Sequence, residues 1–210
     1  MIRRLGSVLI ALGVVLLAWV ATTLLWKEPL TALYTKREQA KLQRQFDSFV
    51  EEAEASPQPR PAVFKPHVPT MRRPPEGKPM GVIVIPEIDV KAVVVEGTET
   101  DELRKGPGHY PETAMPGRGK IVAIAGHRTT YGAWFRHIDD LGRRDRIILR
   151  TPNTRYVYRV AAHKIVDDSD WSIIDPRPGG EWLVLSACHP LYSAKQRYVV
   201  FAKLSETRDT

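Results

Sequence analysis

The chain has 210 residues, and its 31 lysines and arginines against 24 acidic residues give it a net charge of +7. Most of this excess lies in residues 1–79, which carry 12 basic and 7 acidic side chains, whereas residues 80–210 carry 19 and 17. Nucleic-acid-binding proteins concentrate positive charge on the folded domain, so this balance argues against that class of function. The single cysteine excludes an internal disulfide and a cysteine-rich zinc site.

Residues 5–26 form a run of 22 residues without a charge. As a helix this run is about 33 Å long, enough to cross the roughly 30 Å hydrocarbon core of a bilayer. Trp19 and Trp26 lie toward its end, where indole rings favour the membrane interface, and two arginines before it favour a cytoplasmic N-terminus. A cleaved signal peptide has a shorter apolar core and a small-residue cleavage site. We therefore expect residues 1–27 to form a cytoplasmic tip and a retained transmembrane anchor.

Two segments separate this anchor from the rest of the chain. Residues 28–55 predict an amphipathic juxtamembrane helix, because Leu42, Phe46 and Val50 recur at helical spacing while the opposite face is charged. This helix is expected to lie either on the C-terminal domain or on the bilayer. Residues 56–79 contain 8 of the 17 prolines and predict an extended, semi-rigid spacer. The order of anchor, stalk and domain is typical of an enzyme held near a membrane.

Residues 80–207 predict one all-β domain. Short runs of β-branched residues alternate with Gly, Pro and Asp, a pattern typical of strands joined by turns. We expect strands at residues 81–85, 91–95, 120–125, 146–150, 155–166, 181–186 and 197–204. Residues 99–105 and 134–141 predict short helices. Seven or eight short strands in about 130 residues indicate a single closed barrel or a sandwich.

Two of these strands lead directly into reactive side chains. The sequence IVAIAG precedes His127, and LVLSA precedes Cys188. Arg197 opens the last strand, and a hairpin of the last two strands would place it beside Cys188, since antiparallel neighbours lie about 4.8 Å apart. Such a set suits acyl transfer: a thiolate attacks a carbonyl, an imidazole protonates the leaving amine, and a guanidinium stabilises the oxyanion.

The segments around these residues read IVAIAGHRTTYGAWF, LVLSACHP and SAKQRYVVFAKL. They resemble the histidine, cysteine and arginine motifs of the bacterial sortases. GHRTTYGA together with CHPLYSAKQR is most similar to the class E sortases of high-GC Gram-positive bacteria. VIVIPEIDVKAVVVEGT and GPGHYPETAMPGRG are similar to the first strands and the helix-turn of that family, in the same order. The resemblance covers residues 81–204.

The resemblance implies an eight-stranded sortase-type β-barrel with one or two short helices, and Cys188, His127 and Arg197 as the catalytic residues. It also implies the reaction. An LPxTG- or LAxTG-like C-terminal sorting signal would be cleaved between Thr and Gly through a thioacyl-enzyme intermediate. An amine of a cell-wall precursor would then take up the acyl group.

Four residues near the catalytic set are candidate substrate-binding residues. Ala187 stands where the family usually has threonine before the nucleophile, and the missing hydroxyl affects oxyanion support or substrate contact unless Ser186 supplies it. Tyr131 and Trp134 follow the histidine motif and are expected either to line the groove for the sorting signal or to pack in the core.

Other polar residues have simpler interpretations. Arg128 and His189 adjoin catalytic residues, but neighbours on an extended chain point to opposite sides, so neither is expected to act with them. The remaining histidines are expected in the spacer, a turn, a helical turn and a strand: His67, His109, His137 and His163. No cofactor and no metal is expected. An acidic loop could still bind calcium or simply be solvated, and its members are Asp167, Asp168, Asp170 and Asp175.

Together these features predict a single-pass membrane protein with an extracellular transpeptidase domain. Its expected partners are secreted proteins that carry a sorting signal, a cell-wall amine and, through residues 5–26, the membrane; nucleic acid is not among them. Two alternatives stay open: a hydrolytic cysteine peptidase with the same site, and an inactive protein that only binds sorting signals. The first differs from a transpeptidase only in which nucleophile reaches the thioester.

Overall fold

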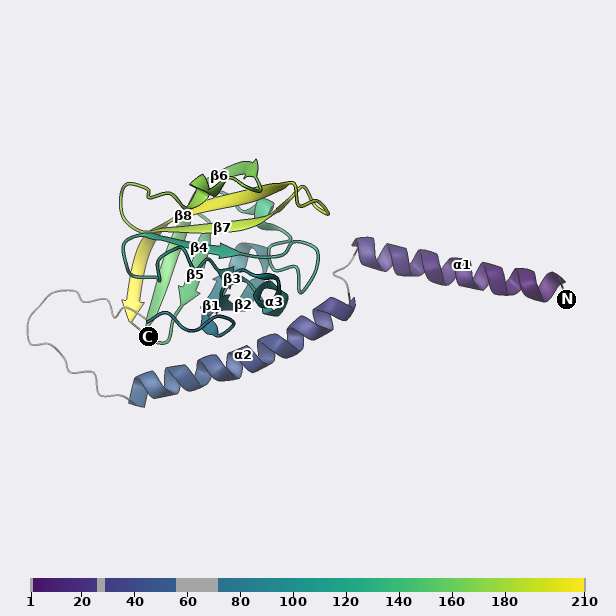
Figure 1. Ribbon diagram of the computed structural model, residues 1–210, viewed down its shortest axis with the longest axis horizontal. Coiled ribbons are helices and arrows are strands. Elements are labelled where there is room, and N and C mark those ends of the chain that lie inside the picture. Colours follow the sequence, from purple (N-terminus) through teal and green to yellow (C-terminus); the bar gives the residue numbers. More distant parts are fainter. Residues whose placement is uncertain (1, 26–28, 56–71, 210) are drawn as a thin grey trace, which may run out of the picture.

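The computed structural model describes residues 2–25, 29–55 and 72–209, and its centre is a closed barrel of eight strands (Figure 1). Their order around the barrel is β1-β2-β3-β4-β7-β8-β6-β5. The strands are β1 (Pro79–Ile85), β2 (Val90–Glu96), β3 (Gly108–His109), β4 (Ile121–Ala125), β5 (Arg146–Arg150), β6 (Thr154–Asp167), β7 (Trp182–His189) and β8 (Gln196–Asp209). The eight-stranded barrel expected from the sequence is confirmed.

The pairing of three strands brings distant parts of the chain to one end of the barrel. β4 and β7 are parallel neighbours, and β7 and β8 form an antiparallel hairpin. The last residues of β4, the last residues of β7 and the first residues of β8 therefore lie together. These are the three places where the sequence analysis located its reactive side chains.

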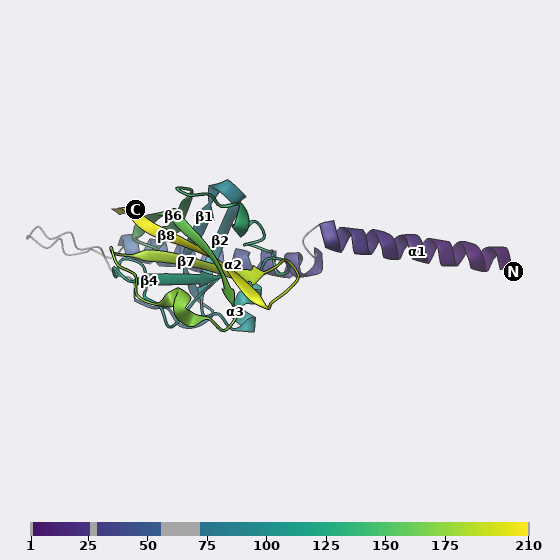
Figure 2. The ribbon, with the colours of Figure 1, turned by 90° about the horizontal axis from the view of Figure 1, so that it is seen from above.

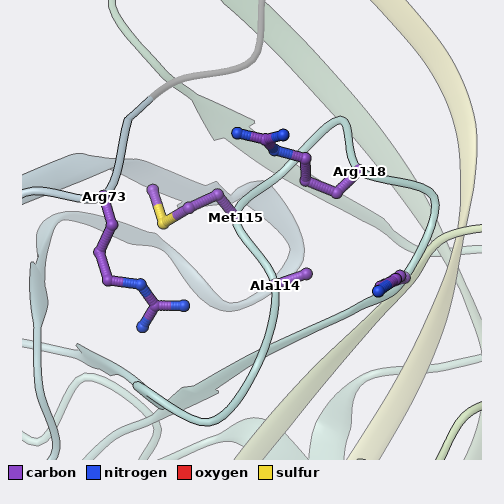
Figure 3. Close-up of a pocket in the computed structure, with 5 residues that line it drawn as sticks. Arg73, Ala114, Met115 and Arg118 are labelled. Atoms are coloured by element: carbon purple, nitrogen blue, oxygen red, sulfur yellow. The ribbon is translucent and has the colours of Figure 1, made fainter.

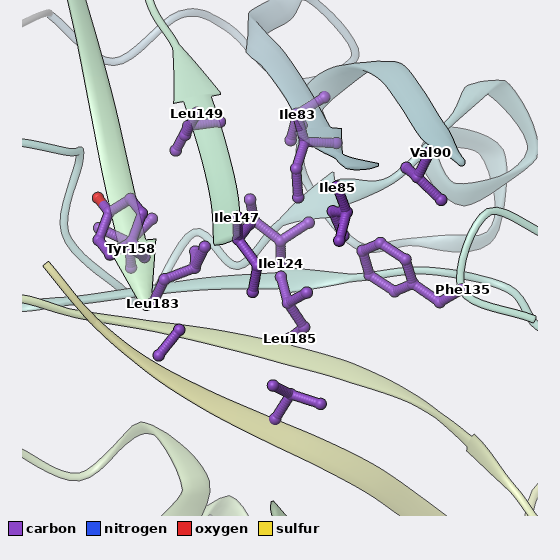
Figure 4. Packing of buried hydrophobic residues seen from close by; sticks show 14 of the residues in the cluster. Ile83, Ile85, Val90, Ile124, Phe135, Ile147, Leu149, Tyr158, Leu183 and Leu185 are labelled. Carbon is purple, nitrogen blue, oxygen red and sulfur yellow. The ribbon is translucent and has the colours of Figure 1, made fainter. Parts of the chain in front are cut away.

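Side chains of these strands alternate between the barrel interior and its outer face, as the two-residue period of a strand requires. Figure 4 shows the interior, which is filled by Ile124, Leu183, Leu185, Phe135 and other apolar residues. A second apolar cluster lies on the outer face of β4, β7 and β8. It is covered by the 3-10 helix η3 (Trp171–Ile174), and it contains Ile121, Ala123, Val166, Ile173, Val184, Val199 and Phe201.

The two N-terminal helices differ in their surroundings. In α1 (Ile2–Leu25) the window Arg4–Thr22 has a mean hydropathy of 2.4 and none of it is buried. α2 (Pro29–Ala55) lies along the barrel (Figures 1 and 2), where Leu42 and Phe46 are buried with apolar side chains of β1 and β2. The predicted amphipathic helix thus lies on the C-terminal domain, the first of the two expected placements.

The structure differs from the sequence-based expectation in three places. Residues 134–141 do not form a regular helix, because Phe135, Ile138 and Leu141 turn into the barrel core; only the 3-10 helix η2 (Ile138–Asp140) forms. The two-residue strand β3 lies where a turn was expected. β7 extends to His189, so the cysteine lies within the strand rather than after it. The expected helix at residues 99–105 forms as α3 (Thr100–Lys105).

A buried polar network connects β3 to the residues before β1. The Nδ1 atom of His109 lies 2.8 Å from Glu96 Oε2, and Arg73 donates to Glu96 Oε1 at 2.6 Å. Both His109 and Glu96 are fully buried, so Arg73 balances the negative charge of the buried Glu96 carboxylate. His109 is therefore structural. Most of the predicted spacer, residues 56–71 with His67, lies outside the described residues.

Candidate active site

Cys188 and Arg197 are direct cross-strand neighbours. The antiparallel register of β7 and β8 pairs Cys188 with Arg197, and Ser186 with Val199 two positions earlier. Side chains of such pairs stand on the same face of the sheet, about 5 Å apart at their Cβ atoms. Because Val184 and Val199 belong to the outer cluster, the thiol and the guanidinium also face the outside of the barrel.

His127 reaches the same place from β4. The parallel register pairs Ala125 with Ser186, and the next step is held by a 3.0 Å hydrogen bond from Gly126 N to the carbonyl of Ser186. His127 follows at the level of Cys188. The three predicted catalytic residues therefore lie at the same end of the barrel: Cys188 and Arg197 are paired on β7 and β8, and His127 follows the end of β4 by two residues.

The surroundings of His127 favour its neutral form. The side chain is half-buried, and this burial, with the nearby positive charge of Arg104 as a second cause, lowers the pKa of His127 below its usual 6.5. Arg104 belongs to α3 and lies 23 residues earlier in the sequence. Its action on His127 was missed by the sequence analysis, since nothing in the local pattern shows which side chain packs against the histidine.

Arg197 is held by the loop between β7 and β8. Its Nη1 donates to the carbonyl of Ala194 at 2.8 Å and to that of Gln196 at 3.1 Å. Within the described part of the chain its Nε and Nη2 groups make no hydrogen bond. The guanidinium is thus fixed on one side and offers donors on the other, as stabilisation of an oxyanion requires. Cys188 is half-buried and is a free thiol.

Ala187 and Ser186 lie on opposite faces of β7. The side chain of Ala187 is buried in the barrel core, so it does not face the thiol and cannot contact a substrate there. Ser186 shares the face of Cys188 and is 1 % exposed, and its Oγ has no hydrogen-bond partner among the described residues. Ser186 is therefore the residue of this pair that supplies a hydroxyl beside the site.

Tyr131 and Trp134 occupy the turn that follows His127. The rings of Tyr131 and His127 lie 5.5 Å apart between centroids, tilted by 37°. Trp134 packs against the barrel core, and its Nε1 is buried without a partner among the described residues. Tyr131 thus lies next to the ring of His127, whereas Trp134 packs between the turn and the barrel core.

Arg128 and His189 follow His127 and Cys188 in the sequence, and their side chains point away from the face that carries the thiol, as expected. Arg128 is buried and donates to Asp139 at 2.6 Å and to the carbonyl of Arg136. The ring of His189 lies 5.8 Å from that of Tyr198 between centroids, tilted by 45°. Elsewhere, Tyr198 Oη lies 3.0 Å from His163 Nδ1, and the exposed His137 pairs with Asp140.

Two other features lie away from this end of the barrel. A cavity of about 490 Å³ is lined by Arg73, Met115, Arg118 and Lys120 (Figure 3), next to the first residue of β4 and therefore at the opposite end from His127. In the acidic loop, hydrogen bonds to Asp170 from the side chain of Ser172 and, second, from its backbone N–H at the start of η3 lower the pKa of Asp170. No three metal-binding side chains converge within the described ranges.

Gly126 is required by close packing directly before His127. A Cβ atom at this position would lie 2.5 Å from Cδ2 of Phe135, whose ring is fully buried. We expect Gly126→Ala to cost about 1–3 kcal/mol of unfolding free energy, the usual cost of overpacking a core. Because the displaced backbone carries His127, the activity of the folded fraction should fall as well. Urea denaturation and peptide-cleavage assays test both effects; Gly142→Ala, where a Cβ meets nothing closer than 3.6 Å, is the control.

Comparison with known proteins agrees with this geometry. The family model described as Sortase domain matches residues 83–205. The chain is 34% identical to Sortase D of Bacillus subtilis over 62% of its length and 66% of the relative's. It is 28% identical to Sortase SrtE1 of Streptomyces coelicolor over 98% of its length and 58% of the relative's. The chain thus spans no more than about two thirds of these curated relatives.

Solved structures show the same similarity. The SrtA sortase from Actinomyces oris superposes with a TM-score of 0.62 at 31% identity, covering 69% of this chain and 89% of that one. Sortase E1 from Streptomyces coelicolor, solved with a tripeptide in the active site, gives 0.61 at 32% identity, covering 63% and 91%. The matched segment and the superposition agree, and the chain belongs to the sortase family of cysteine transpeptidases.

Proposed function

We propose that this protein is a membrane-anchored transpeptidase that attaches secreted proteins to the cell wall. Cys188 attacks the threonine carbonyl of an LPxTG- or LAxTG-like sorting signal, Arg197 stabilises the oxyanion, and His127 protonates the leaving glycine amine. An amine of a cell-wall precursor then resolves the thioester. The observation that supports the proposal is the strand register, which pairs Cys188 with Arg197 and pairs Ala125 with Ser186, two residues before His127 and Cys188.

The proposed location follows from α1. Residues 5–26 would span the membrane, with residues 28–55 as the juxtamembrane helix, residues 56–79 as the spacer and residues 80–207 as the extracellular catalytic domain. The apolar window of α1 is entirely exposed in the protein, which supports a bilayer as its environment. Extraction of the full chain with detergent but not with high salt, and protease sensitivity of the barrel in intact cells, test this arrangement.

The reaction is tested by incubating the full-length protein in detergent with a quenched sorting-signal peptide. Triglycine or diaminopimelate is added as the acceptor amine, and the products are identified by mass spectrometry. A transpeptidase yields the peptide joined to the amine. A hydrolytic peptidase yields only the free threonine carboxylate, and an inactive receptor binds the peptide without cleaving it.

The lowered pKa of His127 predicts a bell-shaped dependence of rate on pH. The active pair holds one proton, on His127, with the thiol ionised; below the pKa of His127 the pair holds two protons, and at high pH it holds none. Burial is the main cause of the lowered pKa of His127 and the charge of Arg104 the second, so Arg104→Gln should move the acid limb part of the way toward higher pH. Lys105→Gln, a charge loss on the same helix, should leave it in place. A rate that rises steadily from pH 5 to 10 contradicts the role of His127 as the acid.

A further inference from the structure

The ring of Tyr131 is surrounded by contacts from three separate elements. It lies 5.5 Å from the ring of His127, and the ring of Tyr34 from α2 meets it edge-on at 6.3 Å and 78°. The guanidinium of Arg104 from α3 lies 5.7 Å from the same ring. The backbone N–H of Tyr131 donates to Thr31 Oγ1 of α2 at 3.2 Å.

The turn that carries Tyr131 adopts an unfavourable backbone. Tyr131, Gly132 and Ala133 have φ angles of 46°, 81° and 44°, so two side-chain-bearing residues occupy the left-handed region. Such conformations are unfavourable for residues with a side chain and persist only where surrounding contacts fix them. Thr31 and Tyr34 supply contacts of this kind, and both come from the beginning of α2.

The same helix also fixes Arg104. Thr35 Oγ1 donates to the carbonyl of Arg104 at 3.0 Å, and Gln39 donates to the carbonyl of Lys105 at 2.9 Å. Gln39 Oε1 in addition accepts from Val93 N of β2 at 2.7 Å. α2 is therefore joined through polar contacts to the barrel and to both elements that flank the imidazole.

We propose that Tyr131 is a positioning residue for His127 and that the first turns of α2 hold it in place. The catalytic histidine then depends on a helix outside the barrel, the one that follows the anchor directly. This inference rests on the proposed function, in which His127 donates a proton to the leaving amine. A general acid must lie within hydrogen-bond reach of the atom it protonates, so a small displacement of the imidazole slows the reaction without weakening substrate binding.

The experiment compares two substrates that differ only in the leaving group. One is the sorting-signal peptide; the other is its thioester analogue, whose thiolate leaving group needs no proton. Single-turnover release of the leaving group is measured with the full-length protein in detergent. Tyr131→Ala should lower the maximal single-turnover rate for the peptide about tenfold, as partial loss of acid catalysis predicts, with the half-saturating concentration unchanged and the thioester rate nearly normal. Tyr131→Phe keeps the ring and should restore the peptide rate.

Variants of α2 test the second half of the proposal. Thr31→Val removes the acceptor of the Tyr131 N–H, and Tyr34→Ala removes the edge-on ring; the double variant should reproduce the selective loss on the peptide. Leu33→Ala is the matched control, because Leu33 is exposed on the same turn of α2. Thermal denaturation of each variant verifies that the barrel is folded.

Four results would overturn the inference. A raised half-saturating concentration with a normal maximal rate, or an equal loss of rate on both substrates, makes Tyr131 a substrate contact instead. Normal peptide turnover in the Thr31 and Tyr34 double variant shows that α2 has no part in the site. An equal loss in Leu33→Ala shows a general effect of the helix on stability. If the unaltered protein processes neither substrate in a Cys188-dependent manner, the proposed function itself fails, which is a separate outcome.

Discussion

Replacing Cys188 with alanine should abolish turnover of a sorting-signal peptide while the barrel stays folded. The thiol is half-buried at the end of the outer face of β7, and it forms no disulfide. No other cysteine is available in the chain to form the thioester. Loss of a covalent nucleophile lowers kcat by more than about a thousandfold, because the acyl-enzyme route is then closed. Peptide cleavage followed over hours, with intact mass measured for the acyl-enzyme, tests this expectation.

The matched control is Ser205→Ala, which removes the hydroxyl of an exposed residue of β8, eight residues beyond Arg197. It tests whether loss of a small polar group from these strands is enough to lower the activity. Near-unchanged thermal denaturation of Cys188→Ala is required for the comparison, since a half-buried thiol contributes little packing. Residual cleavage by Cys188→Ala above about one part in a thousand contradicts its role as the nucleophile.

Arg197→Lys should lower kcat about a hundredfold, close to the loss of one oxyanion donor. Lysine keeps the charge but not the planar fork, and here one edge of that fork is already used, since Nη1 donates to Ala194 and Gln196. An ammonium group that binds both loop carbonyls keeps one N–H to present beside Cys188, whereas the guanidinium keeps the N–H groups of Nε and Nη2 in a fixed plane. Arg197→Ala should lower kcat by at least the same factor. Steady-state kinetics with the sorting-signal peptide measure both variants.

Lys195→Ala, which alters an exposed basic residue of the same loop, is the control for a general charge effect. If Arg197 only formed an exposed ion pair, its contribution would be under about 1 kcal/mol and kcat would hardly change. A near-normal kcat in Arg197→Lys with a raised KM would make Arg197 a substrate-binding residue rather than a catalytic one.

The fold was largely predictable because the strands of this barrel have strong local signals. β5 (Arg146–Arg150) has the predicted bounds, and β1, β2, β4, β6, β7 and β8 differ only at their ends. β3 could not be predicted: its two residues sit in a Gly-Pro-rich segment and are strand only because β2 and β4 flank them. Residues 134–141 carry apolar residues at helical spacing, yet burial of Phe135 and Ile138 in the barrel decides their conformation.

The residues of the candidate site also fall into a group that the sequence predicts and a group that it does not. Cys188, His127 and Arg197 could be located because each adjoins a strand whose pattern is evident and because their motifs resemble those of a known family. That Ala187 faces the core and Ser186 the site follows from strand alternation once the register is known. Thr31, Tyr34 and Arg104 could not be found, because their proximity to the histidine depends on how α2 docks, and an amphipathic pattern does not specify its partner surface.

The docking of α2 also sets how far the enzyme can reach. α1 ends at Leu25 and Thr31 already contacts the turn beside His127, so only five residues separate α1 from the catalytic end of the barrel. Even fully extended, the six Cα-to-Cα steps from Leu25 to Thr31 span about 20 Å. With α1 in the bilayer, as proposed, the thiol works just above the lipid headgroups, and the length of the proline-rich segment does not alter that height. A sorting signal can then be cleaved only while it is still close to the membrane surface.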